Sequence, residues 1–216
     1  MTDRPAPGAT EWGESVGVGP WLGDWPDDPR YDHDLLAHGD RRNVIDRYRY
    51  WSMESIVADL DQRRHPFHVA IENFGHDLNI GTVVRTANAF LAAEVHIVGR
   101  RRWNRRGAMI TDRYQHVRHH ADVAGLLAFA RDHDLCVVAV DNGPGAERIE
   151  TVDLPERCVL LFGQEGPGLT PAARSGATTT VSIAQFGSTR SINAGVAAGI
   201  AMHAWVRQHA DLDGAR

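Results

Sequence analysis

The stretch that decides the fold is IAQFGSTRSINAGVAAG, residues 183–199. It reads as the end of a strand, a polar loop and the start of a helix that we expect to run from Ser191 to about Gln208. Serine is a residue type that caps helix N-termini, and the positive end of the helix dipole would face the loop. The stretch therefore predicts a loop that can hold a polar ligand.

Two further stretches have a similar character. LLFGQEGPGL, residues 160–169, runs from a strand into a turn in which three glycines let the backbone approach a ligand closely. NIGTVVRTANAF, residues 79–90, starts a helix after a strand and carries Arg85 in its second turn. Together the three stretches predict three loops that converge on one site.

In this order the three stretches resemble the motifs of the SpoU (TrmH-like) branch of the SPOUT methyltransferases. The resemblance covers residues from about 67 to 208 and rests on the patterns N-x-G-x-x-x-R-x-A, G-x-E-x-x-G-L and I-x-x-x-G-x-x-x-S-x-N-x-x-V-A. Members of this branch methylate ribose 2'-hydroxyls of RNA. The resemblance therefore implies an RNA (ribose-2'-O)-methyltransferase whose cofactor is S-adenosylmethionine.

Strand-like and helix-like runs alternate along most of the chain. We expect strands at residues 67–71, 94–98, 135–140, 158–162 and 179–183, and helices at residues 79–92, 123–133 and 191–208. This alternation predicts an α/β domain with a mainly parallel sheet flanked by helices. Periodicity alone would predict an unknotted chain. The resemblance implies instead a deep C-terminal trefoil knot, and a homodimer in which each active site is completed across the interface.

The length of 216 residues suits one substantial domain with an extension. We expect an N-terminal extension over residues 1–64, a methyltransferase domain over residues 65–210 and a tail over residues 211–216. Residues 1–30 are rich in Gly, Pro and Asp and predict little regular structure, whereas residues 40–64 show the apolar spacing of a helix. That helix either packs on the core or contacts RNA.

The net charge of −5 argues against an indiscriminate nucleic-acid binder, but residues 100–120 form a local basic patch. Phosphate contacts would make this patch the RNA surface, although an exposed loop without a partner is an alternative. The extension is short for an added RNA-binding domain of the kind that relatives acting on ribosomal RNA carry. We therefore favour transfer RNA, and ribosomal RNA stays possible. The candidate RNA-binding residues are Arg100, Arg101, Arg102, Arg105 and Arg106.

The sequence also bears on the cellular location of the protein and on whether it binds a metal. No run of about 18 apolar residues and no signal-peptide pattern is evident, so we expect no membrane span. Cys136 and Cys158 lie in apolar runs, which favours reduced core cysteines and the cytoplasm. His116, His119 and His120 are close in sequence, but no thiol or carboxylate completes a ligand set, so we expect no metal site.

In the predicted methyl transfer the protein must orient the donor and the hydroxyl rather than activate the donor, because a sulfonium methyl donor is already a strong electrophile. Arg85 matches the arginine that the resemblance implies is catalytic. A guanidinium is protonated at all ordinary pH values. We therefore expect Arg85 to orient a phosphate or the hydroxyl and to stabilise negative charge. A role as general base, and a plain surface arginine, are the alternatives.

Four polar residues complete the predicted catalytic set. Glu165 is expected to contact Arg85 or Asn79, to accept backbone donors, or merely to fix the glycine turn. Asn79 and Asn193 are expected to brace loops through side-chain to backbone hydrogen bonds. Ser191 is expected to cap the last helix and also to face the ligand pocket.

The resemblance implies that the adenosyl pocket is lined by Gly163, Ile183 and Ile192, with Ser191 adjacent. Asp141 and Asn142 are added by position alone, since they end a predicted strand. Two residues depart from the family pattern. Ala184 stands where proline is usual, which would loosen the pocket wall, and Gly195 stands where serine is common; neither change removes a catalytic group.

Two other classes of protein compete with this interpretation. A dinucleotide-binding Rossmann enzyme is disfavoured, because residues 143–145 (GPG) lack the third glycine of the fingerprint and no G-K-[ST] motif occurs. A non-catalytic knotted protein that binds RNA or assists ribosome assembly would keep the fold. Cofactor binding would distinguish it from an enzyme.

Overall fold

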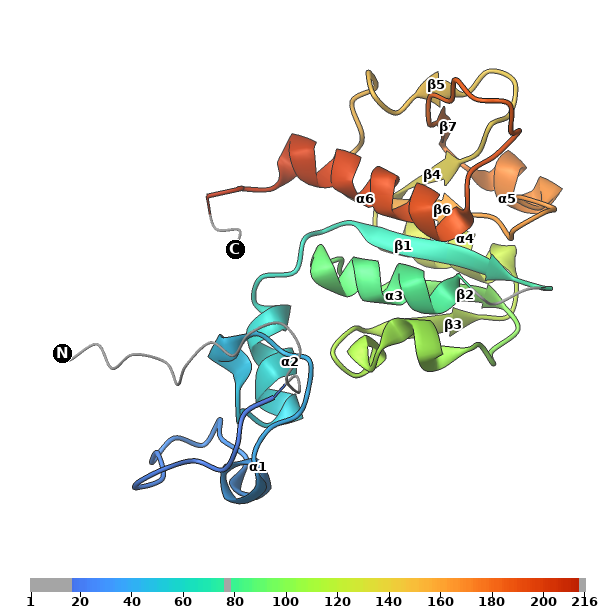
Figure 1. The fold of residues 1–216 in the computed structure, drawn as a ribbon. Helices are drawn as coiled ribbons and strands as arrows, with labels where there is room; N and C mark the ends of the chain where they lie inside the picture. The colour runs from blue at the N-terminus through green and yellow to red at the C-terminus, as the bar shows by residue number, and fades with distance from the viewer. Residues whose placement is uncertain (1–16, 76–78, 214–216) are drawn as a thin grey trace. The chain divides into compact units, whose positions relative to one another are not determined.

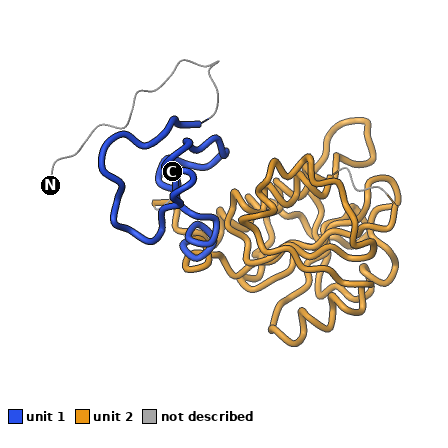
Figure 2. Tube along the Cα trace, turned by 90° about the horizontal axis from the view of Figure 1, so that it is seen from below, with its two compact units in different colours: residues 1–59 blue, residues 60–216 orange. Residues whose placement is uncertain are grey.

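The computed structural model describes residues 17–75 and 79–213 (Figure 1). The chain divides into two compact units, with the boundary between Asp59 and Leu60 (Figure 2). No helix in the described ranges is long and apolar enough to cross a membrane.

In the residues of the first unit that the structure describes, from 17 onward, there is little regular structure apart from three short helical segments. These are α1 (His33–His38), the 3-10 helix η1 (Asp46–Tyr48) and α2 (Met53–Asp61), which runs two residues past the boundary. The predicted helix over residues 40–64 is therefore wrong in its first half. Tyr50 adopts a positive φ of 62°, which a continuous helix does not allow.

A buried carboxylate organises this non-helical segment. Asp40 is fully buried and accepts hydrogen bonds from the backbone N–H of Arg42 (2.9 Å) and of Tyr50 (3.0 Å), and from the Arg42 guanidinium at 2.9 and 2.7 Å. Side-chain acceptors of this kind compete with helical hydrogen bonds. Burial alone would raise the pKa of Asp40, but these hydrogen bonds and the charge of Arg42 outweigh it and hold the pKa below its ordinary value.

The second unit is built on one sheet of seven strands within the described residues, in the order β3-β2-β1-β6-β4-β7-β5. All of its strand pairings are parallel, which confirms the predicted α/β class. Two edge strands, β3 and β5, escaped prediction because neither carries an apolar run. The strands are β1 (His68–Asn73), β2 (Val95–Gly99), β3 (Val117–His120), β4 (Cys136–Val140), β5 (Glu147–Arg148), β6 (Cys158–Phe162) and β7 (Thr179–Ser182).

Helices cover both faces of the sheet (Figure 1). One face packs against α3 (Ile80–Ala89) and α6 (Ala194–His209). The other packs against α4 (Val123–Asp132) and α5 (Pro171–Gly176). Two 3-10 segments, η2 (Arg105–Ala108) and η3 (Thr111–Arg113), follow β2 and contact α3. The result is a three-layer arrangement with the sheet in the middle.

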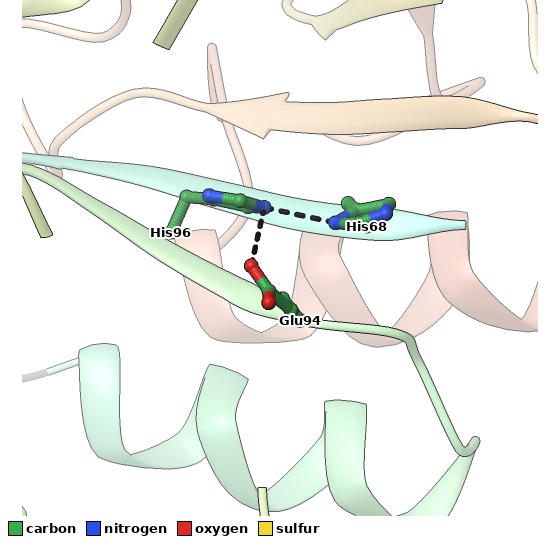
Figure 3. Close-up of side chains that lie close together, drawn as sticks. All are labelled: His68, Glu94 and His96. Atoms are coloured by element: carbon green, nitrogen blue, oxygen red, sulfur yellow. Dashed lines mark hydrogen bonds and ion pairs between the residues drawn. The ribbon is translucent and has the colours of Figure 1, made fainter. Parts of the chain in front are cut away.

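The face under α4 carries a row of histidines. His68, His96 and His120 lie on the adjacent strands β1, β2 and β3, and each neighbouring pair of rings is joined by a nitrogen–nitrogen hydrogen bond of 2.9 Å. Figure 3 shows the first two members of the row beside Glu94. Burial is the largest cause that lowers the pKa of His68 to about 4 and that of His96 to about 2. The rings are therefore neutral at physiological pH.

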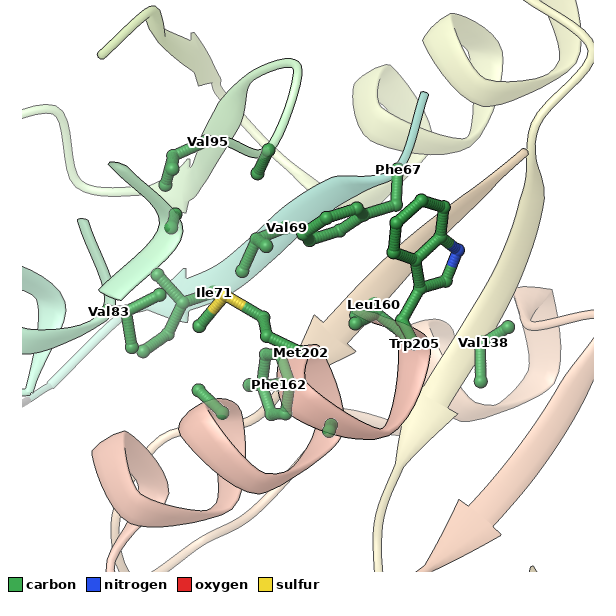
Figure 4. Close-up of a cluster of buried hydrophobic side chains, with 14 of the residues drawn as sticks. Phe67, Val69, Ile71, Val83, Val95, Val138, Leu160, Phe162, Met202 and Trp205 are labelled. Carbon is green, nitrogen blue, oxygen red and sulfur yellow. The ribbon is translucent and has the colours of Figure 1, made fainter. Parts of the chain in front are cut away.

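The face under α3 and α6 holds the larger apolar core (Figure 4). Phe67, just before β1, packs on Trp205 of α6 with ring centroids 4.4 Å apart. The indole N–H of Trp205 donates to the carbonyls of Pro155 (3.2 Å) and Glu156 (3.1 Å), so its burial leaves no donor unsatisfied. Burying a large apolar side chain stabilises a fold by roughly 1.5–3 kcal/mol. This contact fixes the C-terminal helix on the sheet.

The first unit should be sensitive to the charge of Asp40. Replacement by asparagine leaves Arg42 facing a neutral group, and we expect a loss of about 3 kcal/mol near neutral pH. Because the folded-state pKa is depressed, the contribution of Asp40 is present above its unfolded pKa and is lost as pH falls through the folded pKa. Hydrogen exchange of residues 30–52 against pH should show wild type and variant converging in acid.

Asp46→Asn is the matched control, since the Asp46 side chain is 91% exposed and lies 3.8 Å from Arg49. An exposed pair of this kind contributes little. Equal destabilisation by the two substitutions would contradict the role assigned to Asp40.

Candidate active site

Parallel strands bring the loops at their carboxyl ends to one edge of the sheet, where ligands of α/β proteins usually bind. At this edge lies a cavity of about 340 Å³. Three segments form most of its lining: residues 140–142 at the end of β4, residues 162–169 at the end of β6, and the loop between β7 and α6. Two of these segments are the second and third signature stretches.

The loop after β6 folds back on itself immediately. Gln164 and Gly168 exchange backbone hydrogen bonds of 3.2 and 3.0 Å, and a Cβ atom on Gly163 would collide with the backbone of Gly168. The side chain of Gln164 accepts a hydrogen bond of 3.0 Å from the backbone N–H of Phe74, which ties the loop to the end of β1. Only glycine fits at position 163. Glu165 is thereby carried at the exposed tip of the loop.

The three signature stretches meet in one hydrogen-bonded cluster. Asn79 donates through Nδ2 to Oε2 of Glu165 at 2.6 Å. Asn193 donates through Nδ2 to Oδ1 of Asn79 at 3.0 Å and to Oε2 of Glu165 at 3.3 Å. Of the contacts expected for Glu165, the structure shows the one with Asn79 and none with Arg85. We refer to Asn79, Glu165 and Asn193 as the amide–carboxylate cluster.

The last helix begins later than predicted. α6 starts at Ala194, and Asn193 is its N-cap: Oδ1 accepts from the backbone N–H of Gly195 (2.9 Å) and of Val196 (3.2 Å). The predicted cap at Ser191 is therefore wrong. Asparagine is as strong a cap as serine, and it lies next to the first helical residue. Ser191 is exposed and lines the cavity, as part of the loop.

Glycines allow α3 to pack tightly between its neighbours. A Cβ atom on Gly81 would lie 2.7 Å from the backbone of Gly107 in η2, and one on Gly195 would lie 3.2 Å from the methyl group of Thr82. A Cβ atom at position 195 would also lie 3.2 Å from Oδ1 of Asn193, so a serine there would require Thr82 or Asn193 to shift by a few tenths of an ångström.

All six predicted cofactor residues line the cavity. Polar groups make up the larger part of its wall, and apolar side chains such as Ile183 and Ile192 supply the rest. At its rim Asp141 pairs with Arg174 at 2.7 Å, and Asn142 donates to the carbonyl of Arg190 at 3.1 Å. The six residues are Asp141, Asn142, Gly163, Ile183, Ser191 and Ile192.

Gln185 is a cavity residue that the sequence analysis missed. Its Oε1 atom is buried and has no hydrogen-bond partner among the residues that the structure describes. A buried acceptor without a partner is costly, and a ligand donor would remove that cost. Its position two residues after Ile183 was the signal available in the sequence.

Arg85 lies on α3, the helix that begins next to Asn79. Its side chain is exposed and makes no hydrogen bond or ion pair with any residue in the described ranges. It does not line the cavity, so the structure does not bring it together with the other predicted catalytic residues. A guanidinium that the protein leaves unpaired is free to bind an anionic ligand.

The five predicted RNA-binding arginines are exposed on the segment that follows β2. Asn73 fixes this segment, because its Nδ2 donates to the carbonyls of Arg100 (2.7 Å) and Arg102 (3.1 Å). A second cavity of about 300 Å³ lies here and includes Arg101, Trp103 and Arg105 in its lining. The expected basic loop is shorter than predicted, since residues 117–120 form β3.

Comparison with known proteins agrees with this geometry. Residues 66–203 match the sequence model of the SpoU rRNA Methylase family. A protein of Mycolicibacterium smegmatis named as an uncharacterized tRNA/rRNA methyltransferase is 31% identical over 192 residues, which cover 83% of this chain and 60% of the relative. The chain thus spans about 60% of the length of that relative.

Solved structures share the fold. The SpoU methyltransferase AviRb from Streptomyces viridochromogenes in complex with AdoMet has a TM-score of 0.61 and 23% identity, over 69% of this chain and 60% of that one. A structure described as giving insight into 2-OH methylation of C/U34 on tRNA has a TM-score of 0.57 and 27% identity, over 67% and 96% of the two chains.

The family match covers more than half of the chain and includes all three loops that meet at the cavity. The chain therefore belongs to the SpoU rRNA methylase family.

Proposed function

We propose that this protein transfers a methyl group from S-adenosylmethionine to a ribose 2'-hydroxyl of RNA, with transfer RNA favoured over ribosomal RNA. The observation that carries the proposal is the amide–carboxylate cluster. It joins the three signature loops at the rim of a cavity whose lining includes the predicted cofactor residues.

The cavity suits the cofactor in size and chemistry. Ligand pockets typically measure about 300–1,000 Å³, and this cavity of about 340 Å³ combines a mainly polar lining with apolar side chains. Ile183 and Ile192 offer apolar contact to an adenosyl group, Gly163 exposes backbone, and Gln185 offers an unpaired acceptor to an amino group. The bound cofactor would supply an electrophilic methyl group on sulfur. No charged side chain is needed to activate it.

The residues of the protein orient the hydroxyl and stabilise the negative charge on its oxygen. A bound cofactor would supply the methyl group that replaces the hydroxyl proton, and that proton would pass to solvent. Arg85 binds the oxygen or a neighbouring phosphate and stabilises the negative charge that develops. Asn79, Glu165 and Asn193 position the loops, and Asn79 is the member nearest to the helix of Arg85.

The segment from Arg100 to Arg106 presents exposed arginines that suit phosphate contacts on a folded RNA of either kind. One comparison favours transfer RNA. The structural relative with 27% identity concerns methylation of C/U34 on tRNA.

We further propose that the protein is a homodimer, that its chain forms a trefoil knot and that it is cytoplasmic. A homodimer is supported by Val196 and Ile200, which lie one turn apart on α6 and are 54% and 38% exposed. A trefoil knot is supported by the sheet order, in which β6 lies between β1 and β4 while the loop before α6 returns to residue 142. An RNA substrate and the two free cysteines support the cytoplasm.

Labelled methyl transfer tests the function directly. The protein is incubated with labelled S-adenosylmethionine and total RNA from a strain that lacks it, and the RNA is fractionated by size and digested to nucleosides. A labelled 2'-O-methylnucleoside in the transfer RNA fraction is expected. Label in the large RNAs would reassign the substrate, and absence of cofactor binding would favour the non-catalytic RNA-binding protein.

Arg85→Ala should reduce methyl transfer by about 100-fold or more, since removing one charge-stabilising donor has effects of this size. Cofactor affinity, measured by calorimetry, should stay unchanged because Arg85 does not line the cavity. Arg131→Ala on α4, across the sheet, is the matched control and should keep full activity. Near-normal transfer by Arg85→Ala would refute the assignment.

Glu165→Ala should leave the amides of Asn79 and Asn193 without their shared acceptor. We expect a loss of about 10-fold or more in kcat, because misplaced loops reduce near-attack geometry. Glu165→Gln retains an acceptor oxygen and should recover part of the activity. If glutamine behaves like alanine, the charge of Glu165 matters and its role is more than positioning.

Replacing Arg101 and Arg105 together by alanine should weaken RNA binding. The slope of the logarithm of the binding constant against the logarithm of the salt concentration should fall by the amount that corresponds to about one to two phosphate contacts. Cofactor affinity should not change. Filter binding over a range of salt concentrations gives the slope, and Arg131→Ala serves again as control. An unchanged slope would remove this segment from the RNA surface.

A further inference from the structure

We propose that His68, Glu94 and His96 form a binding site for one divalent transition-metal ion of the zinc class. Nδ1 of His68 and Nε2 of His96 lie 2.9 Å apart, and Oε2 of Glu94 lies 3.9 Å from Nε2 of His96. One ligand atom from each residue lies within 4.8 Å of the other two. Figure 3 shows His96 facing both of its neighbours.

The distances suit tetrahedral coordination. Zinc binds imidazole nitrogen and carboxylate oxygen at about 2.0–2.2 Å, which separates neighbouring ligand atoms by about 3.3 Å. The observed separations of 2.9 and 3.9 Å lie on either side of this value. The ligand atoms of His68 and Glu94 lie within 4.8 Å of each other. Small side-chain movements would therefore place the three ligands around one ion, and a water molecule would complete the set.

The surrounding residues orient the ligands as they do in known metal sites, where a ligating histidine donates its other N–H to a partner. Nδ1 of His96 lies 2.9 Å from Nε2 of His120, so a proton on Nδ1 leaves Nε2 of His96 free to bind an ion. Arg118 donates to both oxygens of Glu94 at 2.8 and 3.0 Å. An oxygen that accepts one hydrogen bond keeps a lone pair for a metal.

The neighbouring strands β1 and β2 place the two histidine ligands. His96 is fully buried in β2, and its register partner in β1 is Ala70, two residues after His68 on the same face. Phe129 of α4 covers the imidazoles, with its ring centroid 4.7 Å from that of His96 and 5.7 Å from that of His68. A ligand pair held by adjacent strands is rigid, which favours a defined coordination geometry.

The site lies at the amino ends of β1 and β2, whereas the candidate active site lies at the carboxyl ends of the strands. A bound ion would cross-link the two strands and would not touch the reacting groups. The inference is therefore independent of the proposed function.

Metal titration of the full chain tests the proposal. The protein is stripped with a chelator, dialysed and titrated with Zn²⁺ in competition with a chromophoric chelator, and separately with Co²⁺. One equivalent of Zn²⁺ should bind, and the thermal unfolding midpoint should rise, since an ion that binds only the folded state stabilises it. The Co²⁺ complex should give visible bands of a four-coordinate nitrogen and oxygen site.

Variants identify the ligands. Glu94→Gln and His68→Gln should abolish stoichiometric binding, and both residues are half-buried, so the fold should tolerate the change. His120→Gln should weaken binding by about 10- to 100-fold, as expected for a partner behind a ligand. His119→Gln, on the same strand as His120 with its ring bonded to the carbonyl of Gly99, is the matched control and should bind normally.

Three results would overturn the proposal. Wild-type protein that takes up no Zn²⁺ at micromolar concentration has no such site. If the Glu94→Gln and the His68→Gln variants both still bind one equivalent of Zn²⁺, other residues hold the ion. A Co²⁺ spectrum with thiolate charge-transfer bands would assign the ion to Cys136 and Cys158, which are register partners on β4 and β6.

Discussion

The carboxylate of Glu165 is the point on which the candidate active site depends. It accepts hydrogen bonds from Asn79 and Asn193, which are 86 and 28 positions away in sequence. Exposed hydrogen bonds contribute only about 0.5–1.5 kcal/mol each, so they cannot assemble the loops by themselves. The parallel sheet brings the loops to one edge, and the carboxylate then selects one arrangement among the few that the sheet permits.

Close backbone approach is the second constraint. Gly163 lets the loop after β6 turn back on itself, and Gly81 and Gly195 let α3 contact both η2 and α6. In each case a single methyl group would displace a neighbouring backbone or side chain. The apolar core under α3 and α6 holds these elements together, with Phe67 and Trp205 fastening the last helix to the sheet. The close packing of the helices and the geometry of the loops therefore both depend on these glycines.

The sequence predicted the α/β class because strand-like runs alternate with helical patterns. The motifs pointed to Gly163, Ile183, Ser191 and Ile192 of the cavity, and the end of a predicted strand pointed to Asp141 and Asn142. Its errors have local causes. The edge strand β3 reads VRHH and shows no apolar run. The cap of α6 was misplaced because Ser191 and Asn193 have similar capping propensities. The row of His68, His96 and His120 was invisible, since strand register alone brings together residues more than 20 positions apart.

The loop between β7 and α6 is held in two different ways. Where it joins α6, the helix packs on α3: a Cβ atom on Gly195 would lie 3.2 Å from a methyl carbon of Thr82, and one on Gly199 would lie 3.9 Å from that of Thr86. Earlier in the loop, the contact is an exposed hydrogen bond between Asn142 and the carbonyl of Arg190. Exposed contacts of this kind open far more readily than packed helices. The loop would therefore open first at residues 142 and 190, while its junction with α6 stays closed.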